Sequence, residues 1–116
     1  MRPERLYLDE MVEAADRIAG FIRDVSETDF YGSELLLSGV AHQFMIIGEA
    51  AAHISLETRS RHPHIPWTRI VGFRNVIVHM YFSTDETLLW NAAIHNAPLL
   101  KEQIEDVVKA EYPVEE

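Results

Sequence analysis

The chain contains no cysteine, which excludes disulfide bonds, thiolate metal ligands and a cysteine nucleophile. It also lacks any run approaching the ~18 consecutive apolar residues of a membrane-spanning helix. The opening stretch MRPERLYLDEMVEA has no apolar core of the kind found in signal peptides. With 47% hydrophobic and 25% charged residues among 116, the composition suits one globular domain over residues 1–116. We therefore expect a cytoplasmic protein that does not enter a membrane.

Basic residues are scarce, with 10 Lys and Arg against 19 Asp and Glu, and the net charge is −9. This balance argues against a broad basic footprint for nucleic acid. The acids are unevenly placed, because residues 1–57 hold eleven, residues 85–116 hold eight and residues 58–84 hold none. The acid-free segment 58–84 predicts a local anion-binding site, although segregation by chance remains an alternative. Its cations and histidines are Arg59, Arg61, Arg69, Arg74, His62, His64 and His79.

Strand-like alternation of apolar and polar residues is absent, and apolar residues instead recur at spacings of three and four. Such stripes predict helices over residues 4–25, 33–57, 67–82 and 86–112. The second stripe is apolar on almost every face, which predicts the central helix. Pro98 should kink or split the last helix, so we expect four long helices or five shorter ones. Short loops between them indicate an all-α, antiparallel up-and-down bundle.

Two residues within the central helix indicate contacts with a neighbour. Gly48 costs roughly 1 kcal/mol relative to alanine inside a helix, and we interpret it as a point where another helix approaches closely. Glu49 follows it in apolar surroundings. A carboxylate placed there needs a partner, and an arginine is the obvious kind. On either side of Pro63, His62 and His64 are expected to face solvent or to add positive charge near a cleft.

The stretch RNVIVHMYF, residues 74–82, combines apolar residues with Arg74, Asn75 and His79, which are costly to bury without partners. At ~100° per residue, Asn75 and His79 share one helix face, and Arg74 and Tyr81 share another. Arg74 and His79 lie ~140° apart, so one straight helix does not point both at one small target.

Two interpretations of this divergence remain open. In the first, the polar residues form a buried network, in which Asn75 bonds to His79 and Arg74 pairs with Glu49. In the second, Arg74 and His79 face a cleft, because the helix loosens near its end or because a second subunit supplies one of them across a two-fold axis.

The run RNVIVHMY resembles the R-x-x-x-x-H motif of HEPN (higher eukaryotes and prokaryotes nucleotide-binding) domains, with the H-x-Y ending of HepT-like toxins. GEAA at residues 48–51 resembles the Gly-Glu-Ala of their second helix. IPW at residues 65–67, followed by IVGFRN, resembles the approach to their motif. WNAAIHNAPLLKEQI resembles their last helix, including its proline. The resemblance extends over residues 4–108, and its four features occur in the family's order.

The resemblance implies a small HEPN-like helical bundle that dimerises through the motif helix. It implies a metal-independent endoribonuclease toxin, without a cofactor, that is neutralised by a minimal nucleotidyltransferase antitoxin. Carried over by position, Arg74 and His79 are the catalytic pair, and Asn75 and Glu49 support them. Tyr81 matches the tyrosine that the antitoxin can adenylylate.

The residue types suit this chemistry, because RNA carries its own nucleophile, the ribose 2′-hydroxyl. Histidine titrates nearest to neutral pH and suits proton transfer, whereas arginine stays charged and grips phosphate. The alternatives are a non-catalytic HEPN-like binding subunit of a nucleotidyltransferase complex and a purely structural helical oligomer. Full burial of Arg74 and His79 in a monomer without a cleft would favour the structural oligomer.

Overall fold

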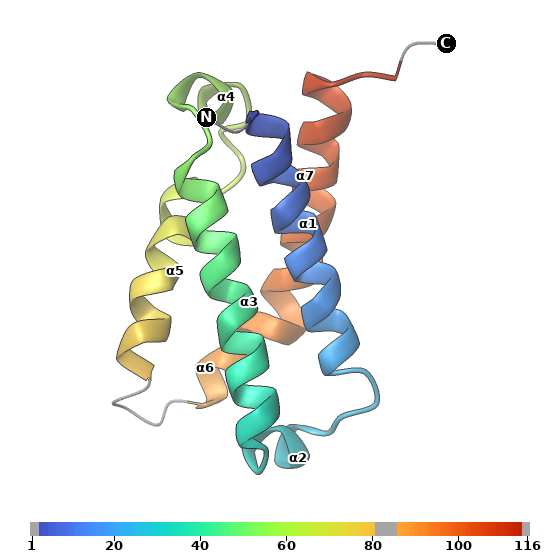
Figure 1. Cartoon of the computed structure of the whole chain (residues 1–116), viewed down its shortest axis with the longest axis vertical. Coiled ribbons are helices and arrows are strands. Elements are labelled where there is room, and N and C mark those ends of the chain that lie inside the picture. The colour runs from blue at the N-terminus through green and yellow to red at the C-terminus, as the bar shows by residue number, and fades with distance from the viewer. Residues whose placement is uncertain (1–2, 81–85, 115–116) are drawn as a thin grey trace.

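Four long helices dominate the computed structural model of the chain (Figure 1). The structure describes the backbone of residues 3–80 and 86–114, and the side chains of these residues except 76 and 78–80. The long helices are α1 (Glu4–Phe21), α3 (Glu34–Ala52), α5 (Trp67–Met80) and α7 (Ala97–Glu111). The connecting elements are α2 (Glu27–Tyr31), α4 (Leu56–Arg61), α6 (Glu86–Asn91) and the π-helix η1 (Ala92–Asn96).

The long helices run alternately up and down, as Figure 1 shows, so the predicted all-α antiparallel bundle is confirmed. Helix α3 lies at its centre and packs against both α1 and α5, and α1 also packs against α7. This central position agrees with the prediction from its all-round apolar sequence.

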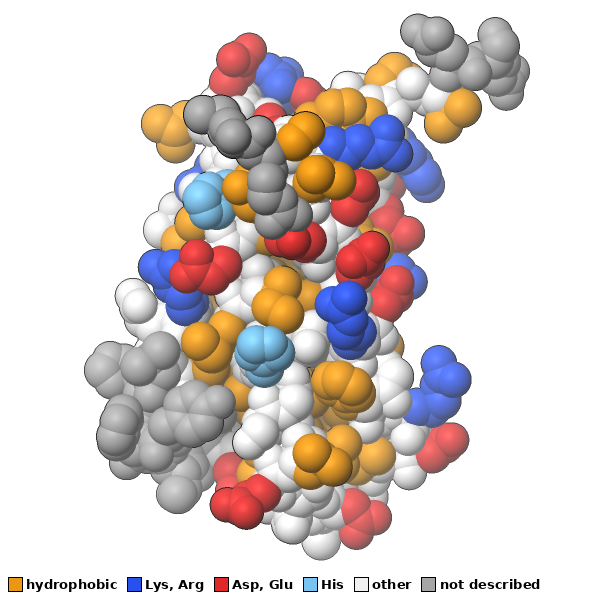
Figure 2. Space-filling model, in the orientation of Figure 1, with side chains coloured by type: hydrophobic (Ala, Val, Ile, Leu, Met, Phe, Trp, Pro, Cys, Tyr) orange, Lys and Arg blue, Asp and Glu red, His pale blue; other side chains and the backbone are white. Residues whose placement is uncertain are grey.

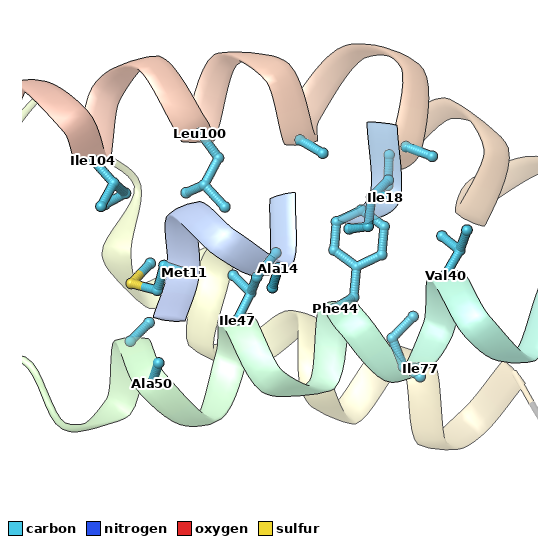
Figure 3. Packing of buried hydrophobic residues seen from close by; sticks show 14 of the residues in the cluster. Met11, Ala14, Ile18, Val40, Phe44, Ile47, Ala50, Ile77, Leu100 and Ile104 are labelled. Carbon is cyan, nitrogen blue, oxygen red and sulfur yellow. The ribbon is translucent and has the colours of Figure 1, made fainter. Parts of the chain in front are cut away.

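The core is built from the stripes that the sequence indicated. Figure 3 shows side chains of α1, α3, α5 and α7 pointing into the shared interior of the bundle. Burial of such side chains is the main stabilising term for a domain of this size. The labelled core residues are Met11, Ala14, Ile18, Val40, Phe44, Ile47, Ala50, Ile77, Leu100 and Ile104.

Helix α3 is also the one described helix that is long and apolar enough to cross a membrane, with a mean hydropathy of 1.4 over its best window. Length and composition alone are weak evidence, because the core helix of a bundle passes the same test. Here α3 is the central element, and eight of its residues are buried against other helices.

The prediction of one helix over residues 33–57 was wrong, because α3 ends at Ala52 and a new helix starts after Ser55. The Ser55 hydroxyl accepts a hydrogen bond from the Thr58 N–H at 3.1 Å, as an N-cap does. The Glu4 carboxylate accepts hydrogen bonds from the Ser55 N–H at 2.6 Å and the Thr58 hydroxyl at 3.0 Å. The start of α1 therefore stabilises a helix boundary some fifty residues away in sequence.

The predicted effect of Pro98 is confirmed, because the last helical stretch is split into α6, η1 and α7. Pro98 lies in the first turn of α7 and has no N–H to donate to the carbonyl four residues earlier, that of Ile94. The chain adopts a wider π turn just before it, in which the Ala97 N–H bonds to the Ala92 carbonyl. Four long helices therefore form, as expected.

Candidate active site on helix α5

Helices α3 and α5 come into close contact at Gly48. A Cβ atom at this position would lie 3.2 Å from the Cβ of Arg74 and 3.4 Å from the carbonyl oxygen of Ile70. The first distance is tighter than an ordinary van der Waals contact and the second is at its lower limit, so a side chain here would require Arg74 to move by a few tenths of an ångström. The interpretation of Gly48 as a point of close approach is confirmed, and it places Glu49 beside Arg74.

Arg74 forms an ion pair with Glu49, in which its Nη1 donates to the carboxylate Oε1. The arginine partner expected for Glu49 is thus confirmed. The Arg74 side chain is 35% exposed and that of Glu49 is 57% exposed, so this arginine is not part of a buried network. Nη1 is its only side-chain donor with a partner among the described residues, which leave its other guanidinium N–H groups unoccupied.

The same helix carries Asn75 and His79, because α5 stays α-helical from Trp67 to Met80. It therefore does not loosen between Arg74 and His79, whose positions remain ~140° apart. Asn75 is exposed. The side chain of His79 and the whole of Tyr81 lie outside the described residues. The catalytic, supporting and regulatory roles of these residues stay predictions.

Much of the positive charge in segment 58–84 is used within the fold. Arg61 binds Glu111 through two nitrogens, with Nη2–Oε1 and Nε–Oε2 distances of 2.6 and 3.0 Å. His62 Nε2 lies 2.9 Å from the same carboxylate, and Arg61 Nη1 donates to Glu57 at 3.0 Å. Hydrogen bonds from Arg61 and then from His62 lower the pKa of Glu111 to about 2. We call these four residues the α4–α7 clamp, since they join those two helices.

The clamp corrects one expectation, because the His62 side chain is only 12% exposed and faces Glu111 instead of solvent. His64 is exposed, as expected. Arg59 is also engaged, since its side chain donates to the carbonyls of Ala51 and Ile54 at 2.8 and 3.1 Å and so caps the end of α3. In the face shown by Figure 2, acidic and basic side chains are interspersed and form no patch of one sign.

Arg69 is the exception among the arginines of segment 58–84. It is exposed and has no ion pair or hydrogen bond from its side chain among the described residues. It lines a groove of about 630 Å³ between α5 and the η1–α7 region. The groove is floored by Phe44 and Ile47 of α3 and walled by Phe73 and Leu100.

Sequence reasoning missed this groove, since its lining comes from α3, α5, α6, η1 and α7, which are distant in sequence. Among the described residues, its polar lining consists of Arg69, Asn91, Asn96 and Gln103, without any Asp or Glu. Among the described residues, no group of three or more His, Asp or Glu side chains is arranged to hold a metal ion.

Comparison with known proteins agrees with the motif on α5. The family described as "Ribonuclease HepT-like" matches residues 11–107. Over 106 residues the chain is 31% identical to "Putative RNase MJ1380" of Methanocaldococcus jannaschii, covering 91% of this chain and 97% of that protein. Over 108 residues it is 32% identical to "Probable ribonuclease HepT" of Thermococcus cleftensis, covering 93% and 98% of the two chains. No solved structure matches. With a family match over most of its length, this chain belongs to the ribonuclease HepT-like family of the HEPN superfamily, as the resemblance predicted.

Proposed function

We propose that the protein is a metal-independent endoribonuclease that cleaves RNA with Arg74 and His79 in a cleft between two protomers. One observation carries the proposal. The guanidinium of Arg74 is partly exposed and donates to Glu49 through a single nitrogen. Arg74 lies on α5, the helix that also carries His79, and the chain belongs to the ribonuclease HepT-like family. The names of the relatives, both ribonucleases, support the same reaction.

The chemistry needs no group beyond these side chains. The 2′-hydroxyl oxygen attacks the adjacent phosphorus, the bond from phosphorus to the 5′-oxygen breaks, and a 2′,3′-cyclic phosphate and a 5′-hydroxyl result. Histidine accepts the 2′-hydroxyl proton and returns a proton to the leaving 5′-oxygen. The free N–H groups of Arg74 stabilise the charge that develops on the phosphoryl oxygens. Glu49 holds the guanidinium in place, and Asn75 lies exposed next to it.

The divergence of Arg74 and His79 on α5 favours a site shared between protomers. Two positions ~140° apart on one continuous helix do not converge on one phosphate. A two-fold axis beside α5 brings Arg74 of one protomer toward His79 of the partner subunit. Residues 76–82, which are apolar apart from His79 and the Tyr81 hydroxyl, have a composition suited to the contact between protomers.

In the cell, we infer a toxin role, with a minimal nucleotidyltransferase as antitoxin, from the family resemblance. Tyr81 is seven residues from Arg74 and shares its face on an ideal helix. Adenylylation of Tyr81 would add a phosphodiester charge on the face where Arg74 is proposed to bind substrate phosphate. A modified tyrosine would therefore compete with RNA for the same cation.

Cleavage of a labelled single-stranded RNA in the presence of EDTA tests the proposal. The wild-type protein should yield 2′,3′-cyclic phosphate ends, and His79→Ala should cleave at least about 100-fold more slowly. His64→Ala is the matched control, because His64 is an exposed histidine just before α5, at the opposite end of that helix from His79. Full activity in His79→Ala would remove His79 from the mechanism. An inactive wild-type protein that still binds a nucleotidyltransferase would support the binding-subunit alternative instead.

A mixing experiment tests the shared cleft. Arg74→Ala and His79→Ala proteins should each be inactive, whereas a heterodimer of the two retains one site with both residues intact. An equimolar mixture, unfolded and refolded together, should recover about a quarter of wild-type activity, since about half of the dimers are mixed and each has one of two sites. Without any recovery, the pairing of Arg74 with His79 of the partner subunit would be wrong.

A further inference from the structure

The groove beside α5 combines an aromatic floor with a polar edge. The rings of Phe44 and Phe73 lie 4.9 Å apart between centroids, and Phe73 is only half-buried. Phe73 therefore presents part of its ring to the groove, whose lining includes it. A volume of about 630 Å³ lies within the range of small-ligand sites and exceeds what a single nucleobase needs, leaving room for its ribose.

The polar edge suits a ligand with a negative charge and with both donors and acceptors. Arg69 is an exposed cation without a described partner, and the described residues that line the groove include no acid, although the chain has 19 acids among 116 residues. Asn91 and Asn96 are exposed and Gln103 is half-buried. Each carboxamide offers two N–H donors and a carbonyl acceptor, which match the edges of unpaired bases.

The π-helix η1 explains why two asparagines line the same groove. Asn91 and Asn96 are five residues apart, which on an α-helix would separate them by ~140°. Asn91 directly precedes the π-helix and Asn96 is its last residue, and the wider winding of this turn brings both positions to the groove. Helical segments of this kind are costly and occur frequently at functional sites.

We propose that this groove binds an unpaired nucleobase of the RNA substrate, with the adjoining phosphate on Arg69; the inference rests on the function proposed above. Arg69 and Arg74 are five residues apart on α5, so they lie on different faces and about 7.5 Å apart along its axis. A strand that crosses α5 can place one phosphate on each arginine. Only single-stranded RNA offers a base free to enter the groove, because a duplex keeps its bases paired and stacked.

Binding of a fluorescent single-stranded RNA, measured by anisotropy at several salt concentrations, tests this inference. The parent protein carries His79→Ala so that the RNA stays intact. Adding Arg69→Ala should weaken binding roughly 3- to 10-fold and reduce the salt-dependence slope by about 0.7, the value for one phosphate contact to a single strand. Arg23→Ala is the matched control, because Arg23 is an exposed arginine in the loop after α1, and its affinity and slope should equal those of the parent.

The role of the two asparagines is tested with RNA homo-oligomers, each of which contains a single type of base. The parent should prefer one of oligo-A, oligo-C, oligo-G or oligo-U, and Asn91→Ala with Asn96→Ala should lower the affinity for that oligomer about 5-fold or more. Affinities for the other oligomers should change little. This loss of preference would support base recognition, since a general loss of folding would weaken all four alike.

Three results would overturn the inference, and they separate it from the proposed function. If the parent binds RNA but the Arg69 and asparagine variants match it, the groove is not a base site and the proposed function still stands. If the parent binds no RNA but the wild-type protein cleaves it, only the groove inference fails; if the wild-type protein also cleaves no RNA, both proposals fail. If Arg69→Ala changes the mass of the particle in solution, the groove is a contact between protomers.

Discussion

Two ion pairs join arginines of segment 58–84 to distant glutamates, and they differ in how many donors the protein uses. In the α4–α7 clamp, all three side-chain nitrogens of Arg61 contact protein oxygens, and Glu111 also contacts His62. At the crossing of α3 and α5, Arg74 gives Glu49 only one nitrogen. The Glu111 side chain is 17% exposed, whereas that of Glu49 is 57% exposed.

The difference separates a structural arginine from one that remains able to bind a ligand. A guanidinium has five N–H donors, and a phosphate needs two of them in a planar fork. All three side-chain nitrogens of Arg61 contact protein oxygens, two of them on Glu111, whereas among the described residues Arg74 uses only Nη1, which Glu49 orients. Charge counted along the sequence therefore overstates the anion-binding capacity of segment 58–84.

The largest effect on RNA cleavage should come from replacing Arg74, with Arg61 replaced for comparison. Arg74→Ala should lower kcat/KM for RNA cleavage by about 100-fold or more, as loss of a preorganised charged donor does. Arg61→Ala should leave kcat/KM within about 2-fold, since its contacts are to the protein, while lowering the Tm. Steady-state cleavage assays and thermal unfolding of both proteins check this. Equal losses of activity would show that the two arginines are not distinct in function.

Gly48→Ala tests whether the close contact between α3 and α5 is needed for stability and for the position of Arg74. The added methyl group meets the Arg74 Cβ and the Ile70 carbonyl, so overpacking of about 1–3 kcal/mol should outweigh a propensity gain of about 1 kcal/mol. Urea unfolding should show a net loss of stability, together with reduced cleavage. Gly20→Ala is the control, because a Cβ there meets nothing within 4 Å and should not destabilise α1. Equal stabilisation by both substitutions would contradict the close approach.

Glu111→Gln should weaken the α4–α7 clamp in a pH-dependent way. The folded-state pKa of about 2 lies below the ordinary value of 4.5, so Glu111 contributes stability above pH 4.5 that is lost as the pH falls toward 2. The variant should lose about 1 kcal/mol at pH 7 and show a shallower decline between pH 4.5 and 2. Urea unfolding by circular dichroism across that range measures both. Glu102→Gln, an exposed glutamate on α7, should retain the wild-type profile.

The smallest effect should come from Glu49→Gln. An ion pair this exposed contributes about 0–1 kcal/mol, so the Tm should change little, in contrast to Glu111→Gln. The amide oxygen can still accept from Arg74, and cleavage should stay within a few-fold of wild type. Glu49→Ala removes the acceptor and should lower kcat more than Glu49→Gln. If Glu49→Gln and Glu111→Gln lower the Tm equally, the contrast between the two ion pairs is wrong.

Local features were predictable where they depend on near neighbours. The spacing of apolar residues is set by helix geometry, so the long helices and their core stripes followed from it. Gly48 and Pro98 were interpretable because a missing side chain and a missing N–H each have a direct physical consequence. The single helix predicted over residues 33–57 failed because the cap at Ser55 is held by Glu4, far away in sequence.

The sequence by itself determined the helical class, the antiparallel bundle, the need for a partner at Glu49 and the motif on α5. Only the tertiary structure decided which arginines remain free, since that depends on where Glu111, Glu49 and the carbonyls at the end of α3 lie in space. It also assembled the groove from elements distant in sequence. Residue type sets what a side chain can do, but the contacts formed on folding set what it is still free to do.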